Sequence, residues 1–274
     1  MINNYESIDG TTLDEIWAQL FQLSQMPNAD VMGATMLRIK NPIATDMFAE
    51  PSQIRLEIDN LLKRKGRPRV RETAGIIFPY STWKSKNWNI DQLTTWYVGE
   101  FMPRLRAIAP PHLRNTYFER MVNYSGLPGA TETDNQLKFL ISACRDGNQQ
   151  IRHFRQSGLQ VSIFDPKRDH SRNPRKNFPC LQQLGFHFQA DGSLGLSAYY
   201  PTQLIIERAY GNYLGLCQLG IFMADQLGIT FTEFVCFVGS PRMGNDFRKG
   251  DLVELSRIAK ETVDASHELP ATIK

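Results

Sequence analysis

The sequence predicts an α+β fold in which helices cover a mixed or antiparallel sheet and one long helix is buried. Helical periodicity dominates the first half of the chain, whereas the second half turns to short β-rich runs with a hairpin signal. One segment of the second half, Gln203 to Leu227, is apolar on nearly every face, as a buried helix requires. Helices followed by strands indicate α+β rather than a repeating βαβ unit.

Length and composition favour one globular body. With 274 residues, 42% of them hydrophobic, the chain can build a substantial core, and we expect residues 1–274 to form a single domain. A formal net charge of +3 implies no general attraction to nucleic acid. We find neither a basic leader followed by an apolar run nor a stretch of about eighteen apolar residues. We therefore expect a soluble, cytoplasmic protein that does not enter a membrane.

The first half reads mainly as helices. One is expected to begin at Thr11 or Thr12, because acids follow in its first turn and apolar residues recur at helical spacing through Phe21. Residues 36–40 alternate and end at a turn, which predicts a strand. Gly75 to Pro79 predicts a short apolar strand or a buried turn. Further helices are predicted over 51–65, 89–107, 112–123 and 134–147.

The second half reads mainly as strands. Residues 159–164 are β-rich, and the runs 184–188 and 194–200 form a predicted hairpin. Asp191-Gly192 joins the two runs, and its glycine supplies the positive φ that a tight turn requires. The buried helix over 203–227 is followed by a strand over 234–238. A final helix is predicted from Asp251 onward.

Cys180 is the candidate nucleophile. The four cysteines form no CxxC pair and have no histidine cluster beside them, so we expect a reduced chain without a metal site. A cysteine near an apolar strand is most often a small buried hydrophobe. Cations close before Cys180 favour its thiolate, the nucleophilic form, although such a stretch is more often a solvated loop. The cations are Lys167, Arg168, His170, Arg172, Arg175 and Lys176.

Asn212, at the head of the long apolar segment, is the candidate contact to a substrate ring. A carboxamide offers one donor face and one acceptor, which matches N3–H and O4 of uracil. The alternative is a polar side chain that hydrogen-bonds at a helix start.

The region from Leu159 to Gly239 resembles thymidylate synthase and its relatives, the pyrimidine hydroxymethyltransferases. The resemblance covers about the last two-fifths of the chain and weakens toward the N-terminus. The stretches that carry it are Val161–Pro166, Phe178–Cys180, Phe186–Leu194, Gly211–Leu216 and Phe234–Gly239.

The resemblance implies a thymidylate synthase-like fold and a role for both candidate residues. Cys180 falls on the nucleophile that adds to C6 of the pyrimidine, and Asn212 on the asparagine that reads the base. Relatives that act on cytosine typically carry aspartate there, so Asn212 favours a uracil nucleotide. The implied reaction is methylation at C5 with 5,10-methylenetetrahydrofolate, in a homodimer. The alternatives are a hydroxymethyltransferase and a catalytically degenerate nucleotide-binding relative.

Several family positions are replaced. Leu181 stands where a histidine usually follows the nucleophile, Pro201 and Thr202 stand where an Arg-Ser pair binds phosphate, and Leu204 stands where an aspartate contacts the folate ring. Proline cannot clamp a phosphate as arginine does. We assign no folate contact from the sequence.

Arg152 and Arg155 are the sequence candidates for holding the phosphate, because the family also places arginines there, reaching across a dimer interface. Two alternatives stay open. The substrate lacks the usual 5′-phosphate, or the site is degenerate.

Two other functions compete. A cysteine hydrolase needs a base beside Cys180, and His170 and His187 are near in sequence, although His187 would face the opposite side of a strand. A nucleic-acid-binding module is suggested by the basic run Lys63–Arg71. That run follows a helix end, where cations are favourable in any case, so we expect no nucleic-acid partner. A true nucleic-acid binder would lose affinity steeply with salt.

Overall fold

The computed structural model describes residues 5–26, 32–42, 51–109, 115–126, 134–145, 155–172, 179–244 and 246–268. The chain divides into two compact units, each discontinuous in sequence. Unit 1 takes Met1–Ala74, Tyr200–Leu214 and Thr232–Lys274, and unit 2 takes Gly75–Tyr199 and Gly215–Phe231. The single domain expected over 1–274 stays a prediction.

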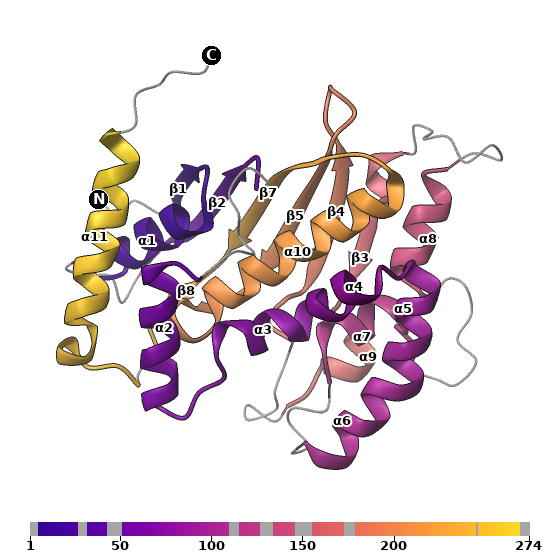
Figure 1. The fold of residues 1–274 in the computed structure, drawn as a ribbon, viewed down its shortest axis with the longest axis horizontal. Helices are drawn as coiled ribbons and strands as arrows, with labels where there is room; N and C mark the ends of the chain where they lie inside the picture. The colour runs from indigo at the N-terminus through magenta and orange to yellow at the C-terminus, as the bar shows by residue number, and fades with distance from the viewer. Residues whose placement is uncertain are drawn as a thin grey trace. The chain divides into compact units, whose positions relative to one another are not determined.

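Unit 1 contains a mixed three-stranded arrangement. Strand β1 (Tyr5–Gly10) pairs in parallel with β2 (Ala34–Lys40), which pairs antiparallel with β7 (Phe231–Val238). Helix α11 packs against both α1 and α2, so the indigo start and the yellow end of the chain lie side by side in this unit (Figure 1). These helices are α1 (Leu13–Leu23), α2 (Gln53–Arg64) and α11 (Val253–Glu268).

Helix α1 shows how the sequence sets this packing. The Thr12 side chain accepts a hydrogen bond from the Glu15 N–H at 3.1 Å and so caps the helix, as predicted. Trp17 stacks on Phe21 with ring centroids 5.1 Å apart, and both side chains are fully buried. The Trp17 indole N–H donates to the Ile205 carbonyl at 3.0 Å. The apolar face of α1 is thereby fixed in position by one specific polar contact.

Unit 2 contains three antiparallel strands, β3 (Gln160–Ser162), β4 (Gln183–Phe188) and β5 (Leu194–Tyr200). The predicted hairpin is confirmed, because Gly192 has φ of 84° and the Asp191 carboxylate accepts from the Ser193 N–H at 3.0 Å. The helices of this unit are α4 (Tyr80–Lys86), α5 (Ile90–Trp96), α6 (Met102–Ile108), α7 (Tyr117–Val122), α8 (Gln136–Ala143) and α9 (Pro166–Asp169). A π-helical turn, η2 (Tyr97–Phe101), joins α5 to α6.

The long apolar segment is helical for most of its length. It opens with the short strand β6 (Gln203–Leu204), which pairs with β8 (Pro241–Arg242), and passes through a π-helical turn, η6 (Ile205–Ala209), into α10 (Tyr210–Leu227). Within unit 2, Phe222 of α10 packs on Phe78 and Trp83 at 4.9 and 5.3 Å between centroids. The predicted buried helix is therefore confirmed, and so is an α+β fold with a mixed sheet.

One sequence expectation is wrong. Gly75 to Ile77 belong to a helix, α3 (Val70–Ile77), and form neither strand nor turn. Val70, Ala74 and Ile77 are buried at helical spacing, and this tertiary burial decides between the two structures that a short apolar run can adopt. No helix among the described residues combines the length and the apolar character that crossing a bilayer demands.

Candidate functional site

The four cysteines, all of which are described, differ sharply in exposure. Cys180 is exposed, whereas Cys144, Cys217 and Cys236 are at most 2% exposed, and none of the four forms a disulfide. Burial raises the pKa of the Cys217 thiol far above its ordinary value, which keeps it protonated. A reactive cysteine must be accessible. The structure therefore singles out Cys180, and the alternative of a buried structural cysteine is wrong for this residue.

The backbone around Cys180 is anchored just ahead of β4. The hydroxyl of Tyr117, in the first turn of α7, accepts from the Cys180 N–H at 3.2 Å. Leu181 is fully buried, which explains why an apolar residue occupies the position where the resemblance implies histidine. Sequence reasoning missed Tyr117 as a partner, because no local pattern links residues this far apart.

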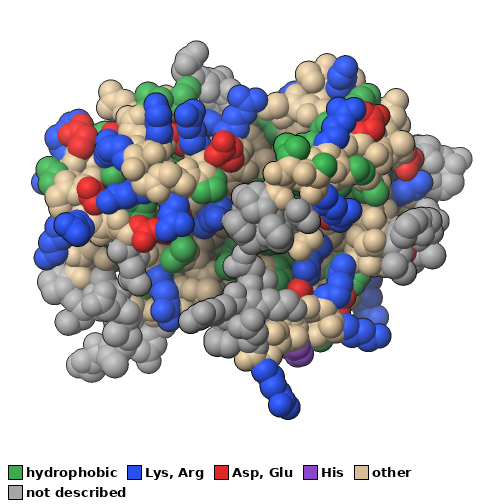
Figure 2. Space-filling view, turned by 90° about the horizontal axis from the view of Figure 1, so that it is seen from below, with side chains coloured by type: hydrophobic (Ala, Val, Ile, Leu, Met, Phe, Trp, Pro, Cys, Tyr) green, Lys and Arg blue, Asp and Glu red, His purple; other side chains and the backbone are tan. Residues whose placement is uncertain are grey.

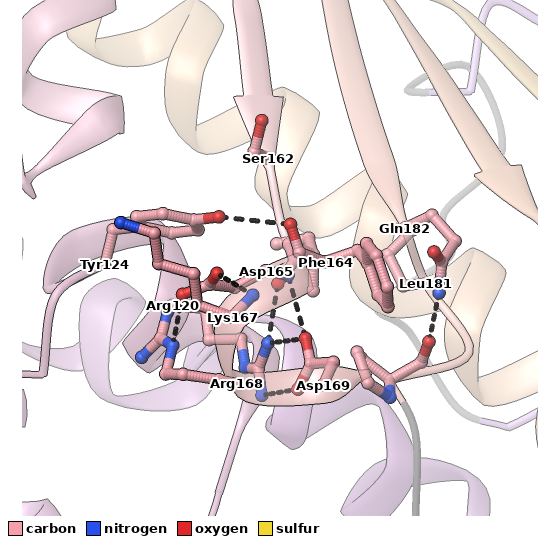
Figure 3. A network of polar contacts seen from close by, with 12 residues as sticks. Arg120, Tyr124, Ser162, Phe164, Asp165, Lys167, Arg168, Asp169, Leu181 and Gln182 are labelled. Carbon is pink, nitrogen blue, oxygen red and sulfur yellow. Dashed lines mark hydrogen bonds and ion pairs between the residues drawn. The ribbon is translucent and has the colours of Figure 1, made fainter. Parts of the chain in front are cut away.

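A polar network lies beside this segment (Figure 3). Arg120 of α7 and Asp169 of α9 form a two-pronged ion pair with N–O distances of 2.6 and 2.8 Å, and Arg120 also donates to the Ile163 carbonyl at 2.7 Å. Asp169 accepts in addition from the Asp165 N–H at 2.8 Å. Both charged side chains are largely buried, with 16% and 4% of their surfaces exposed. The network holds the turn from Ile163 to Asp169 in one conformation.

This turn is joined directly to the chain that follows Cys180. The Ile163 and Phe164 N–H groups donate to the Gln182 carbonyl at 2.9 and 3.1 Å. Burial alone would raise the pKa of Asp169, but the hydrogen bonds from Arg120 and from the Asp165 backbone outweigh burial and hold the pKa below its ordinary value. Asp169 therefore stays ionised and keeps the anchor intact at neutral pH.

The basic stretch before Cys180 is partly neutralised. Arg168 donates to the Asp165 carboxylate at 2.7 Å, and its guanidinium lies over the Tyr124 ring, 5.0 Å from the centroid. Arg175 and Lys176 lie outside the described residues. Arg168 thus contributes to the local structure. The Asp165 carboxylate balances its charge, which weakens the effect of that charge on the Cys180 thiol.

Asn212 lies in the first turn of α10, in unit 1, and is 5% exposed. Among the residues that the structure describes, none forms a hydrogen bond with its carboxamide. Buried polar groups are nearly always paired, so an unpaired carboxamide is a candidate ligand contact. The preceding Gly211 permits a close approach of α3, since a Cβ there would lie 2.7 Å from the Thr73 Cβ and 2.8 Å from the Val70 carbonyl oxygen.

Glu207, in the π-helical turn just before α10, is a residue that sequence reasoning missed. It is 9% exposed, and its Oε2 is buried and has no hydrogen-bond partner in the part of the chain that the structure describes. Burial, and then the charge of Asp246, raise the pKa of this carboxyl above its ordinary value. π-Helical turns occur frequently at functional sites. The sequence signal was a Glu-Arg pair inside an otherwise apolar segment.

The structure does not bring Arg155 to Cys180. Arg155 is exposed and precedes a short 3₁₀ turn whose Gln156 side chain donates to the Phe188 carbonyl, at the end of β4. Cys180 lies before the start of β4, a strand of six residues that spans about 17 Å at about 3.3 Å per residue. Arg152 lies outside the described residues. A contribution of either arginine from a second subunit stays a prediction.

The predicted site residues fall in both units. Cys180 and Arg155 belong to unit 2, whereas Asn212 belongs to unit 1. Among the described residues, no group of three or more His, Cys, Asp or Glu side chains is placed to hold a metal ion.

The alternative functions gain little support. His187 packs on Gly195, where a Cβ would lie 2.2 Å from its Nε2, and His170 packs on Phe164 at 5.2 Å. Each ring thus has a packing partner of its own. In the basic run Lys63–Arg71, Lys65 pairs with Asp251 at 2.9 Å, and Arg67 pairs with Asp246. In the face of the molecule drawn in Figure 2, acidic side chains lie among the lysines and arginines.

Comparisons with known proteins give matches among solved structures. Neither a protein-family model nor a curated protein matches the sequence. Among solved structures, the chain is similar to the thermostable thymidylate synthase A from Bacillus subtilis, with a TM-score of 0.45 and 11% sequence identity. The alignment covers 92% of this chain and 84% of that chain.

Proposed function

We propose that this protein transfers a one-carbon group to C5 of a uracil nucleotide through a covalent adduct between Cys180 Sγ and C6. The observation that carries the proposal is the exposure of Cys180 against the burial of the other three thiols. Asn212 supports it, because this residue is 5% exposed and its carboxamide has no hydrogen-bond partner among the described residues, so the imide edge of a ring could pair with it.

The chemistry follows from these two groups. The thiolate adds to C6 and forms the S–C bond, and the electron pair of the C5=C6 double bond moves toward C5 and O4. Asn212 accepts from N3–H and donates to O4, where negative charge develops. C5 then forms its bond to the donated carbon as that carbon's bond to its carrier breaks. Loss of the C5 proton and cleavage of the S–C6 bond restore the C5=C6 double bond and release the thiolate. The proposal requires both side chains to reach one ring.

The carbon donor that the resemblance implies is 5,10-methylenetetrahydrofolate. Leu204, at the position of the aspartate that contacts the folate ring, is apolar and 38% exposed, so it offers no hydrogen bond to a pterin. This position does not fit the folate, and no step of the chemistry above is assigned to it. A homodimer that completes the site is part of the proposal.

The test is covalent capture. Wild-type protein is incubated with 5-fluoro-dUMP, with and without 5,10-methylenetetrahydrofolate, and intact mass is measured. We expect an adduct with wild type and with Cys217→Ser, the matched control at a buried thiol, and none with Cys180→Ser. Absence of any wild-type adduct with fluorinated uracil or cytosine nucleotides would refute the transferase. Reversible binding without an adduct would instead establish a nucleotide-binding relative that has lost catalysis.

A further inference from the structure

The π-helical turn η2 carries residues that contact the start of α7. In this turn the Met102 N–H donates to the Tyr97 carbonyl, five residues back. In a regular α-helix, residues five apart point about 140° away from each other, whereas a π-turn brings them closer to one face. Tyr97 and Met102 are both fully buried. The turn directs both side chains at one hydroxyl, that of Thr116.

The Thr116 hydroxyl caps α7 and uses its full hydrogen-bonding capacity. It accepts from the Tyr97 hydroxyl at 2.9 Å and from the Glu119 N–H at 3.1 Å, and it donates to the Met102 sulfur at 3.8 Å. A hydroxyl has one donor and two acceptor positions, so all three are occupied. Burial raises the pKa of Tyr97 far above its ordinary value, so its hydroxyl keeps the proton that it donates.

Helix α7 depends on these contacts because it is short. Its six residues are too few for a stable helix in isolation, so its position is set by its cap and its packing. The Tyr97 ring meets the Phe118 ring edge-on, with centroids 4.7 Å apart. Arg106 of α6 adds an ion pair with Glu119. The π-turn and α6 thus fix the first turn of α7.

Tyr117, the next residue after the cap, transmits this constraint to Cys180. Its hydroxyl accepts from the Cys180 N–H at 3.2 Å and, more weakly at 3.5 Å, from the Leu181 N–H. The Cys180 side chain is exposed, so the position of its thiol depends strongly on how its backbone is held. A displacement of Tyr117 would release that backbone.

We propose that Tyr97, acting through the Thr116 cap, is a positioning residue for Cys180. The cap fixes Tyr117, and Tyr117 holds the backbone of the nucleophile. The catalytic consequence rests on the proposed function, whereas the physical link from Tyr97 to the Cys180 amide stands on the contacts alone. A nucleophile that is aimed in advance raises the rate of the covalent step rather than the affinity for substrate.

The physical link is tested by hydrogen exchange of the Cys180 and Leu181 amides, followed by NMR. Tyr97→Phe keeps the buried ring and removes only the donor, and both amides should exchange roughly 3- to 10-fold faster, the effect of one lost hydrogen bond. Thr116→Val should act likewise, whereas Thr116→Ser keeps the hydroxyl and should match wild type. Thr12→Ala is the matched control, since it removes the cap of α1, in unit 1.

The catalytic consequence is tested by the rate of covalent capture of 5-fluoro-dUMP. We expect Tyr97→Phe and Thr116→Val to lower the maximal rate roughly 10-fold with unchanged half-saturation. Thr116→Ser and Thr12→Ala should retain the wild-type rate. Iodoacetamide needs no fixed orientation and should label Cys180 at the same rate in every variant.

Unchanged exchange of the Cys180 amide in Tyr97→Phe, or an equal acceleration in Thr12→Ala, would overturn the proposal. Faster exchange with an unchanged rate of capture would also overturn it, because the contacts would then not position the thiol. If wild type captures no fluorinated nucleotide, the proposed function fails, and the exchange experiment alone decides whether Tyr97 holds the Cys180 backbone. Should Tyr97→Phe not fold, the pair Thr116→Val and Thr116→Ser carries both measurements.

Discussion

Replacing Arg120 with methionine should destabilise the protein, because it leaves the Asp169 carboxylate buried without its partner. Arg120 donates to both Asp169 oxygens, at 2.6 and 2.8 Å, and to the Ile163 carbonyl at 2.7 Å. Removing one partner of a buried ion pair costs about 3–5 kcal/mol. Since 16% of the Arg120 side chain is exposed, we expect a loss near the lower bound, about 3 kcal/mol.

The measurement is urea denaturation at pH 7. Asp169→Asn should cost less, about 1–2 kcal/mol, because the amide still accepts one hydrogen bond. The double variant should lose less than the sum of the single losses, since the two residues act as one unit. Arg104→Met is the control. That arginine is 79% exposed and 3.6 Å from Glu100, so its loss should stay under about 1 kcal/mol.

The same pair predicts a pH dependence. Because the folded-state pKa of Asp169 is lowered, its stabilisation is present above the ordinary carboxyl pKa and is lost as pH falls through the lowered value. The stability gap between wild type and Asp169→Asn should therefore shrink below about pH 4. A gap that is constant with pH, or an Arg120→Met loss no larger than that of Arg104→Met, would refute this account of the network.

Two further outcomes are expected. Glu207→Gln should gain thermal stability relative to wild type as pH rises from about 4.5 toward neutral, because the raised pKa means that ionising the buried carboxyl opposes folding; identical pH profiles would contradict this. Brief treatment of the native protein with iodoacetamide should modify Cys180, as read by peptide mass mapping, and modify Cys144, Cys217 and Cys236 only after unfolding. Comparable labelling of all four native thiols would show that exposure does not separate them.

Local signals predicted the parts of the fold that are decided locally. The cap at Thr12 and the Asp191-Gly192 turn are satisfied within a few residues, so their sequence patterns suffice. Gly75 to Ile77 failed because a short apolar run fits either a strand or a helix, and only burial of the surrounding helical positions resolves it. Strand β1 was not predicted, because its place depends on pairing with β2.

In the candidate site, too, local sequence signals found some residues, whereas contacts between residues distant in the chain were missed. Cys180 and Asn212 were found from the sequence, because their chemistry and spacing carried a resemblance. The Tyr117 contact to Cys180 and the pair of Arg120 with Asp169 were missed, since each joins residues distant in the chain. The π-helical turn that holds Glu207 was also missed, because it interrupts a segment whose composition indicates helix throughout.

The two sets of polar groups differ in how fully they are satisfied. Beside Cys180, Arg120 and Asp169 bond to each other and to the backbone, as a scaffold that positions the chain should. At the start of α10, the Glu207 carboxyl oxygen and the Asn212 carboxamide have no hydrogen-bond partner among the described residues, and Arg208 makes one weak contact. An unsatisfied buried polar group costs about 1–3 kcal/mol, so the Glu207 carboxyl oxygen reduces stability unless a ligand completes it. The segment from Glu207 to Asn212 is therefore suited to binding, and the turn beside Cys180 to holding a nucleophile in place.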